Sequence, residues 1–211
     1  MPYPTKRAHF DNCIFNIYED VYEPAEDSFL FAENLEVKEG ERILDVGTGC
    51  GILGVVAGKK GGDVVAVELN PYAIRCAKQN ASLNGVPGKI NFIQASLFTA
   101  LNQDATFDLI LFNAPYLPSE EGEAASWIGR AWAGGANGRV VVDRFISEVP
   151  MHLKPFGRVL LMQSTLTGME ETLQKFDEHG LKATVKAERK LPFFETLTLI
   201  EAQAVVPKKQ F

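Results

Sequence analysis

Four consecutive residues, Asn113-Ala114-Pro115-Tyr116, follow the apolar run 107–112 and are suited to holding a flat NH2 group. An asparagine side-chain oxygen and a backbone carbonyl can accept the two N–H bonds of an amide or an exocyclic amine. The tyrosine ring offers a face to the same planar group, and the proline stiffens the turn. This combination predicts that residues 113–116 bind and orient a planar nitrogen that takes part in a reaction.

A second chemical signal is the stretch Asp45-Val46-Gly47-Thr48-Gly49-Cys50-Gly51, between a predicted strand and a predicted helix. Glycines in this position let the backbone approach a nucleotide cofactor closely. The spacing Gly-x-Gly-x-Gly, with an acid two residues earlier, differs from the Gly-x-Gly-x-x-Gly pattern of dinucleotide enzymes. An aspartate there suits the cationic amino-acid part of S-adenosylmethionine, directly or through water. We therefore expect Asp45, Gly47, Thr48, Gly49 and Gly51 to form the cofactor loop.

Two more strand ends are predicted to complete the cofactor site. Glu68 ends a strand about twenty residues after Gly47, where a carboxylate can accept hydrogen bonds from both ribose hydroxyls, and Leu69 follows it. After the next strand, Ser96 could accept a hydrogen bond from the adenine amine. A neutral hydroxyl is a weaker partner than a carboxylate. Leu97 can pack on the base.

Alternating strands and helices are predicted to position these residues. Apolar runs predict seven strands, at residues 42–46, 63–68, 90–94, 107–112, 158–163, 182–188 and 196–202. Helices are predicted at residues 23–35, 52–60, 71–84 and 140–153, and from a capping box at 167–170 to Gly180. Asn70 and Pro71 form a favourable helix start.

This order predicts an α/β protein with a doubly wound, Rossmann-like, mostly parallel sheet of seven strands and one antiparallel edge strand. Its ligand crevice is expected at the carboxyl ends of the strands. Residues 117–138 are predicted to form a long functional excursion. We expect one domain over residues 1–211, with an extended amino-terminal arm at about residues 1–21.

Composition excludes several other classes of protein. The net charge of −6 argues against broad non-specific nucleic-acid binding, which relies on Lys and Arg. Three scattered cysteines predict neither a disulfide framework nor a zinc site, and the three histidines lack ligand spacing. No apolar run is long enough to span a bilayer, and no signal-peptide pattern opens the chain. We expect a cytoplasmic protein with no membrane partner and no metal.

Four stretches together resemble the HemK-type protein glutamine methyltransferases, in particular their short archaeal and eukaryotic branch. They are Tyr22-Glu23-Pro24-Ala25-Glu26-Asp27-Ser28-Phe29, the glycine loop, residues 113–116, and Ala131-Trp132-Ala133-Gly134-Gly135 with Gly138-Arg139 and Asp143-Arg144-Phe145. The resemblance implies a class I methyltransferase fold that uses S-adenosylmethionine. It further implies methyl transfer to the glutamine of a Gly-Gly-Gln motif in a class-1 translation release factor.

The resemblance also assigns roles to residues. Ser28 and Asn113 would join Asp45, Gly47, Glu68, Ser96 and Leu97 in the cofactor pocket, and residues 113–116 would hold the glutamine amide. Ala114 replaces a proline that is usual in the family, but this position contributes mainly a backbone carbonyl. Ser96 replaces an acid. The short branch often works with a small zinc-binding activator subunit, so such a partner is possible here.

Other functions compete with this interpretation. Adenine N6 presents the same planar NH2 group, so a nucleic-acid amino-methyltransferase is an alternative. A base in a duplex must be flipped out, which normally goes with a basic groove or an added recognition domain, and the acidic composition indicates neither. A non-catalytic methyltransferase-like subunit is a second alternative. An NAD-dependent oxidoreductase is disfavoured by the glycine spacing.

Overall fold

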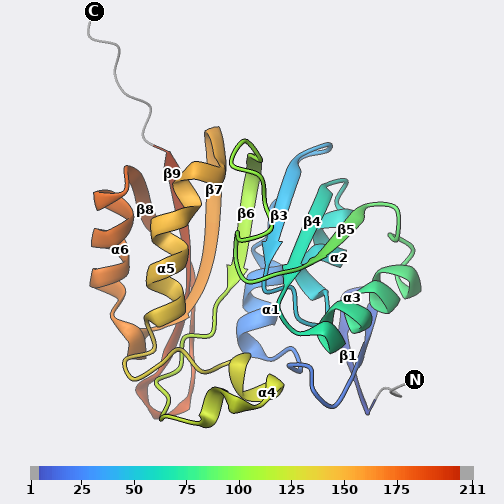
Figure 1. Cartoon of the computed structure of the whole chain (residues 1–211), viewed down its shortest axis with the longest axis horizontal. Coiled ribbons are helices and arrows are strands. Elements are labelled where there is room, and N and C mark those ends of the chain that lie inside the picture. The colour runs from blue at the N-terminus through green and yellow to red at the C-terminus, as the bar shows by residue number, and fades with distance from the viewer. Residues whose placement is uncertain (1–4, 205–211) are drawn as a thin grey trace, which may run out of the picture.

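A seven-stranded sheet, with helices on both of its faces, forms the body of the protein (Figure 1). The computed structural model describes residues 5–204. Strands follow the order β5-β4-β3-β6-β7-β9-β8. Their bounds are β3 Arg42–Val46, β4 Asp63–Glu68, β5 Ile90–Gln94, β6 Phe107–Asn113, β7 Leu153–Ser164, β8 Leu181–Lys190 and β9 Thr196–Ala204. The predicted doubly wound, mostly parallel sheet is therefore confirmed.

One strand of the sheet, β9, runs antiparallel to its neighbours. The strands from β5 to β7 pair in parallel, whereas β9 is antiparallel to both of its neighbours, β7 and β8. The antiparallel strand thus lies one position inside the edge, and β8 forms the edge itself. Chain order reverses between β3 and β6, because β3 leads outward to β4 and β6 leads the other way to β7. Ligands bind at such a switch point in open α/β sheets.

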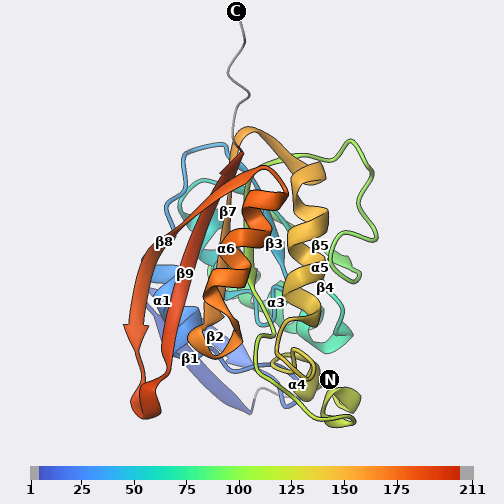
Figure 2. The ribbon, with the colours of Figure 1, turned by 90° about the vertical axis from the view of Figure 1, so that its left-hand side faces the viewer.

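Six α-helices are described: α1 Glu26–Glu33, α2 Ile52–Lys59, α3 Pro71–Leu83, α4 Trp127–Arg130, α5 Val140–Glu148 and α6 Met169–Glu178. Helices α1 and α2 pack together, α2 contacts α3, and α5 packs on α6. Figure 2 shows α5 and α6 on one face of the sheet and α1 on the other. The central strands are buried from both sides, which explains why β3 and β6 are almost continuously apolar. None of these helices is both long and apolar enough to cross a bilayer.

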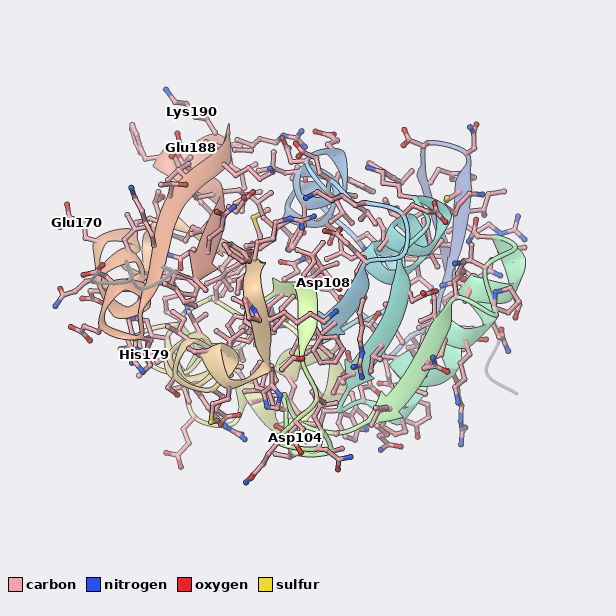
Figure 3. The ribbon with its side chains drawn as sticks, turned by 90° about the horizontal axis from the view of Figure 1, so that it is seen from above. Asp104, Asp108, Glu170, His179, Glu188 and Lys190 are labelled. Carbon is pink, nitrogen blue, oxygen red and sulfur yellow. The ribbon has the colours of Figure 1, made fainter. Side chains whose placement is uncertain are left out.

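The edge strand β8 is protected by charge. It carries Lys182, Lys186, Glu188, Arg189 and Lys190, and Figure 3 shows Glu188 and Lys190 on this outer side of the sheet. Such charges discourage another chain from pairing with an open edge. The opposite edge, β5, is more apolar, since Phe92 and Ile93 are only half-buried.

The amino-terminal segment does not project as an arm. It forms an antiparallel hairpin of β1 (Lys6–Phe10) and β2 (Cys13–Ile17) that packs on α3. Asn80 on α3 accepts a hydrogen bond from the Asn16 N–H at 2.9 Å and donates one to the Asn16 carbonyl at 2.9 Å. The first four residues of the predicted arm lie outside the described residues.

Two predicted helix starts are wrong. Helix α1 begins at Glu26 rather than Glu23, and the preceding residues are extended. Helix α6 has no capping box: Gly168 precedes it at φ +73°, and the Thr167 hydroxyl donates to the Ser164 carbonyl instead. The Arg139 guanidinium also donates to the carbonyls of Thr167 and Gly168 at this helix start.

Other boundaries shift for local reasons. The helix predicted at residues 140–153 changes at Glu148 into the 3₁₀ helix Val149–His152, where Pro150 lacks the N–H that an α-helix needs. Strand β7 begins earlier than predicted, at Leu153. The Asn70 cap is confirmed, because its side-chain oxygen accepts a hydrogen bond from the Tyr72 N–H at 2.9 Å.

Candidate active site

A cavity of about 370 Å³ opens at the carboxyl ends of β3, β4, β5 and β6. Eleven predicted residues line it: Ser28, Gly47, Thr48, Gly49, Glu68, Leu69, Ser96, Leu97, Asn113, Ala114 and Pro115. The structure thus brings together residues from five separate segments of the chain. Asp45, Gly51 and Tyr116 do not reach the cavity wall and lie behind it.

The glycine loop joins β3 to α2 and depends on the absence of side chains. Gly51 has φ +88°, and a Cβ there would lie 3.0 Å from the Cβ of Ala77 on α3. The close approach of α2 and α3 therefore requires glycine at this position. Asp45 organises the loop from below: its buried carboxylate accepts hydrogen bonds from the Thr48 hydroxyl at 2.5 Å and from the Gly54 N–H. Burial raises the Asp45 pKa to about 7, against these hydrogen bonds.

Glu68 is held rigidly at the end of β4. One carboxylate oxygen accepts a hydrogen bond from the Gly49 N–H at 3.0 Å, and the other accepts from the Asn70 N–H at 2.8 Å. Burial raises the Glu68 pKa, and these backbone donors oppose the shift. Each oxygen retains a lone pair that can accept a further hydrogen bond. The side chain is therefore pre-oriented to bind a ligand with two adjacent hydroxyls.

The wall beyond Glu68 is suited to a flat apolar group. Leu69 is a partly exposed aliphatic side chain on the cavity. Ser96 and Leu97 follow β5, and Leu97 has φ +48°, a conformation that is costly for a leucine. Phe98, the next residue, instead stacks on His152 at 4.8 Å and belongs to the core. This end of the cavity combines an apolar surface with a neutral hydroxyl.

The Asn113 amide has a defined orientation. Its nitrogen donates to the Asp27 carboxylate at 3.2 Å and to the Ser28 hydroxyl at 3.2 Å. Because a carboxylate only accepts hydrogen bonds, this contact turns the amide nitrogen toward Asp27 and the oxygen away. The buried Oδ1 atom of Asn113 has no hydrogen-bond partner among residues 5–204. An unsatisfied buried acceptor costs about 1–3 kcal/mol, and a ligand that donates an N–H would remove this penalty.

Asp27 is the centre of this polar cluster. It is almost fully buried and accepts hydrogen bonds from the Ser28 N–H at 2.5 Å and from the Tyr22 hydroxyl at 3.3 Å. Burial, and then the negative charge of Asp27, raise the pKa of Tyr116. Tyr116 therefore remains a neutral hydroxyl beside the carboxylate.

The excursion after β6 covers part of the cavity. Its helix α4 is capped by Ser126, whose hydroxyl accepts from the Gly129 N–H at 3.0 Å. Trp127 and Arg130 line the cavity from this helix, and the guanidinium lies 4.9 Å from the centre of the indole ring. The excursion is closed at its base, where the Leu117 N–H donates to the Trp132 carbonyl at 3.0 Å.

Gly138 and Arg139 fasten the end of the excursion to the site. Gly138 has φ +71°, and a Cβ there would clash with both the Tyr116 carbonyl oxygen and the Thr167 methyl group. The buried Arg139 guanidinium donates to Asp143 at 2.7 Å and to the carbonyls of Thr167 and Gly168. Position 138 therefore requires a glycine for steric reasons, and Arg139 holds the neighbouring backbone in place through hydrogen bonds.

Asp27 is the main site residue to which the sequence alone assigned no role. It was visible only as an acid in the stretch before Ser28, and its contact with Asn113 joins residues 86 positions apart. Tyr22, Arg130 and Arg144 also line the cavity without a predicted role. Their positions depend on packing between distant segments, so no local spacing reveals them.

The fold and the cavity define a class of protein. A doubly wound sheet, a glycine loop, an acid at the second strand end and an Asn-x-Pro-Tyr turn at the switch point form the arrangement of a methyltransferase. The family model for the methyltransferase small domain matches residues 24–128. The Mtq2 subunit of the Encephalitozoon cuniculi Mtq2–Trm112 complex superposes with a TM-score of 0.71 at 26% identity. That match covers 88% of this chain and 99% of Mtq2.

Curated relatives narrow the class further. A Methanocaldococcus jannaschii protein, provisionally named a protein N5-glutamine methyltransferase, is 43% identical over 87% of this chain and 92% of its own length. Methyltransferase HEMK2 of Homo sapiens is 34% identical over 87% of this chain and 90% of its own length. The chain belongs to the HemK2/Mtq2 group of protein N5-glutamine methyltransferases, and by homology it is an S-adenosylmethionine-dependent N-methyltransferase.

Proposed function

We propose that this protein methylates the side-chain amide nitrogen of the glutamine in the Gly-Gly-Gln motif of a class-1 translation release factor. One observation carries the proposal: the Asn113 amide is held by Asp27 and Ser28 with an unsatisfied oxygen buried at the cavity. The Encephalitozoon cuniculi complex, described as responsible for methylation of the eRF1 termination factor, supports this substrate.

The cavity residues fit S-adenosylmethionine. We assign the ribose hydroxyls to Glu68, whose two oxygens are already oriented by backbone N–H groups. Leu69 and Leu97 would pack on the adenine, and Ser96 would meet its amine. The glycine loop and Ser28 would hold the amino-acid part. Asp45 acts indirectly in this scheme, because it supports the loop through Thr48 without reaching the cavity.

The substrate residues are proposed to act by orientation. An amide nitrogen is a poor nucleophile because its lone pair is delocalised into the carbonyl. Asn113 Oδ1 and the Ala114 carbonyl would each accept one N–H of the glutamine and direct the nitrogen toward the methyl group. When bound, S-adenosylmethionine supplies that methyl group on a positively charged sulfur. The acids Asp27 and Glu68 favour positive charge nearby, and the methylated glutamine nitrogen would then lose a proton to water.

Partner binding is a further part of the proposal. The Mtq2 relative is found in a complex with Trm112. In this chain, the apolar edge strand β5, with Phe92 and Ile93 half-buried, is our candidate surface for a small zinc-binding activator subunit. Equal solubility and activity with and without such a subunit would contradict this part.

The test is a methyl-transfer assay with labelled S-adenosylmethionine. We expect label on a cognate class-1 release factor and none on a factor whose Gly-Gly-Gln glutamine is replaced. The assay should be run with and without the activator subunit. Transfer to DNA or RNA but not to the factor would instead support the nucleic-acid alternative. Failure to bind the cofactor under either condition would support a non-catalytic subunit.

A further inference from the structure

We propose that the turn between β8 and β9 is a docking site for the body of the protein substrate, separate from the pocket that takes the target glutamine. This inference rests on the proposed function, because only a macromolecular substrate could reach both places. Its main residue is Phe194, which lies in the turn, and its second is Leu166 in the neighbouring 3₁₀ helix Thr165–Thr167.

Both side chains expose apolar surface to solvent. The Phe194 side chain is fully exposed, and more than half of Leu166 is exposed. Phe194 also has φ +68°, which costs energy for a bulky residue and gains no burial in return. Exposed aromatic residues of this kind become the buried anchors of protein interfaces.

The position of the turn connects it to the site. The Thr196 N–H donates to the Thr165 hydroxyl at 3.0 Å, which joins the turn to the 3₁₀ helix. That helix in turn adjoins the substrate motif, because Gly138 lies between Thr167 and the Tyr116 carbonyl. Figures 1 and 2 place the β8–β9 turn and α4 at the same end of the molecule. A protein whose glutamine enters the cavity therefore faces the end of the molecule that carries this turn.

The turn is also well fixed, as a docking site should be. The Leu191 N–H donates to the Glu195 carbonyl at 2.8 Å and closes the turn. Just before it, Arg189 on β8 forms an ion pair with Glu33 of α1 at 2.6 Å. A preorganised anchor binds with a smaller loss of conformational entropy than a mobile one.

Charge indicates the chemistry of the partner surface. Glu195 follows Phe194 in the sequence, and its charge contributes to the raised pKa of Tyr116. The acids Glu120, Glu121 and Glu123 are exposed in the excursion after β6. We therefore expect an apolar patch on the substrate protein, accompanied by basic residues near its glutamine loop.

The chain supplies a matched control for the test. Phe156 is also largely exposed and has φ +64°, but it lies near the start of β7, at the opposite end of the parallel strands from the cavity. Asparagine tolerates this backbone conformation, so Phe194→Asn and Phe156→Asn should both fold. Strain and exposure are shared by the two positions, and only their location relative to the site differs.

The experiment compares methylation of the intact release factor with methylation of a short peptide that carries the Gly-Gly-Gln segment. For Phe194→Asn we expect a rise of about tenfold in KM for the intact factor and unchanged kinetics for the peptide. The double variant Leu166→Ser/Phe194→Asn should be weaker still, whereas Phe156→Asn should match the wild type. Thermal unfolding of each variant checks its fold.

Three outcomes would overturn the inference. Wild-type KM for the intact factor in both Phe194 variants would remove the docking site and leave the proposed function intact. An equal rise in KM for the factor and the peptide would place the effect in the glutamine pocket. No transfer by the wild type to either substrate, with the activator subunit present, would overturn the proposed function and this inference with it.

Discussion

The two halves of the cavity, which we assign to the cofactor and to the substrate, are built in different ways. In the cofactor half, the glycine loop and Glu68 come from a single strand–helix–strand unit, and the Glu68–Gly49 hydrogen bond spans 19 residues. In the substrate half, Asn113 depends on Asp27, 86 residues earlier, and Tyr116 packs against the glycine at position 138. The glycine loop and Glu68 are thus close in sequence, whereas the contacts of Asn113 and Tyr116 join distant segments of the folded protein.

This difference has an energetic consequence. Backbone N–H groups position Glu68, so the cofactor half tolerates side-chain changes around it. Side chains position Asn113, so the substrate half depends on each member of the cluster. We therefore expect substitutions in the substrate half to lower kcat, and substitutions in the cofactor half to lower cofactor affinity. The predictions below test this division, from the largest expected effect to the smallest.

Asn113→Ala should produce the largest loss. Without Oδ1, one N–H of the substrate amide has no acceptor, and a missing oriented hydrogen bond at a reacting group lowers kcat by about 10²–10³-fold. Steady-state methyl transfer to the release factor measures this loss, and titration calorimetry measures cofactor affinity in the same variant. A larger effect on cofactor affinity than on kcat would contradict the proposed division.

Asp27→Ala should lower kcat by about 10²-fold, because the Asn113 amide would be free to rotate and present its nitrogen to the substrate. Asp27→Asn retains an oxygen that can accept from Asn113 and should recover part of the rate. The adjacent Glu26 is exposed, so Glu26→Ala is the matched control and should keep wild-type kcat. Equal activity in Asp27→Ala and Asp27→Asn would argue against a positioning role.

Glu68→Gln should weaken cofactor binding by about tenfold. The glutamine NH2 group would face one of the two backbone N–H groups that now donate to the carboxylate, and one hydrogen bond would be lost. At saturating cofactor, kcat should stay near the wild-type value. Calorimetric titration with S-adenosylmethionine tests the first statement, and methyl-transfer kinetics test the second.

We expect the titration of Asp45 to make the free energy of unfolding depend on pH, without changing the rate of methyl transfer. Burial raises its pKa from 3.8 to about 7 in the folded protein. Between these values the folded state binds a proton that the unfolded chain does not, so the free energy of unfolding falls as pH rises. Asp45→Asn should reduce this fall. Some slope should remain, because the pKa of Glu68 is raised as well and acts in the same direction.

Urea unfolding of the wild type and of Asp45→Asn at pH values between 4 and 8 measures this effect. A fall of equal size in both proteins would show that Asp45 is not the titrating group. Unchanged cofactor affinity in Asp45→Asn would further support its indirect role beneath the glycine loop.

Much of this protein could be predicted because its signals are local. The strands β3, β4 and β5 match their predicted bounds, since each is a short apolar run between clear turn residues. The Asn70 cap was predictable because an N-cap acts on a backbone N–H two residues away. The predicted capping box at residues 167–170 is absent, because the Thr167 hydroxyl donates to the Ser164 carbonyl and Gly168 takes the N-cap position.

The sequence by itself determined the strand–helix order, the glycine loop, the acid at the end of β4 and the Asn-Ala-Pro-Tyr turn after β6, because each depends on neighbouring residues and backbone geometry. Only the tertiary structure decided that Asp27 orients Asn113, that Asp45 lies beneath the glycine loop, and that Phe194 is fully exposed in the turn between β8 and β9. These features depend on tertiary contacts between segments that are distant in sequence. Hydrophobic packing of helices on the sheet determines which segments come into contact.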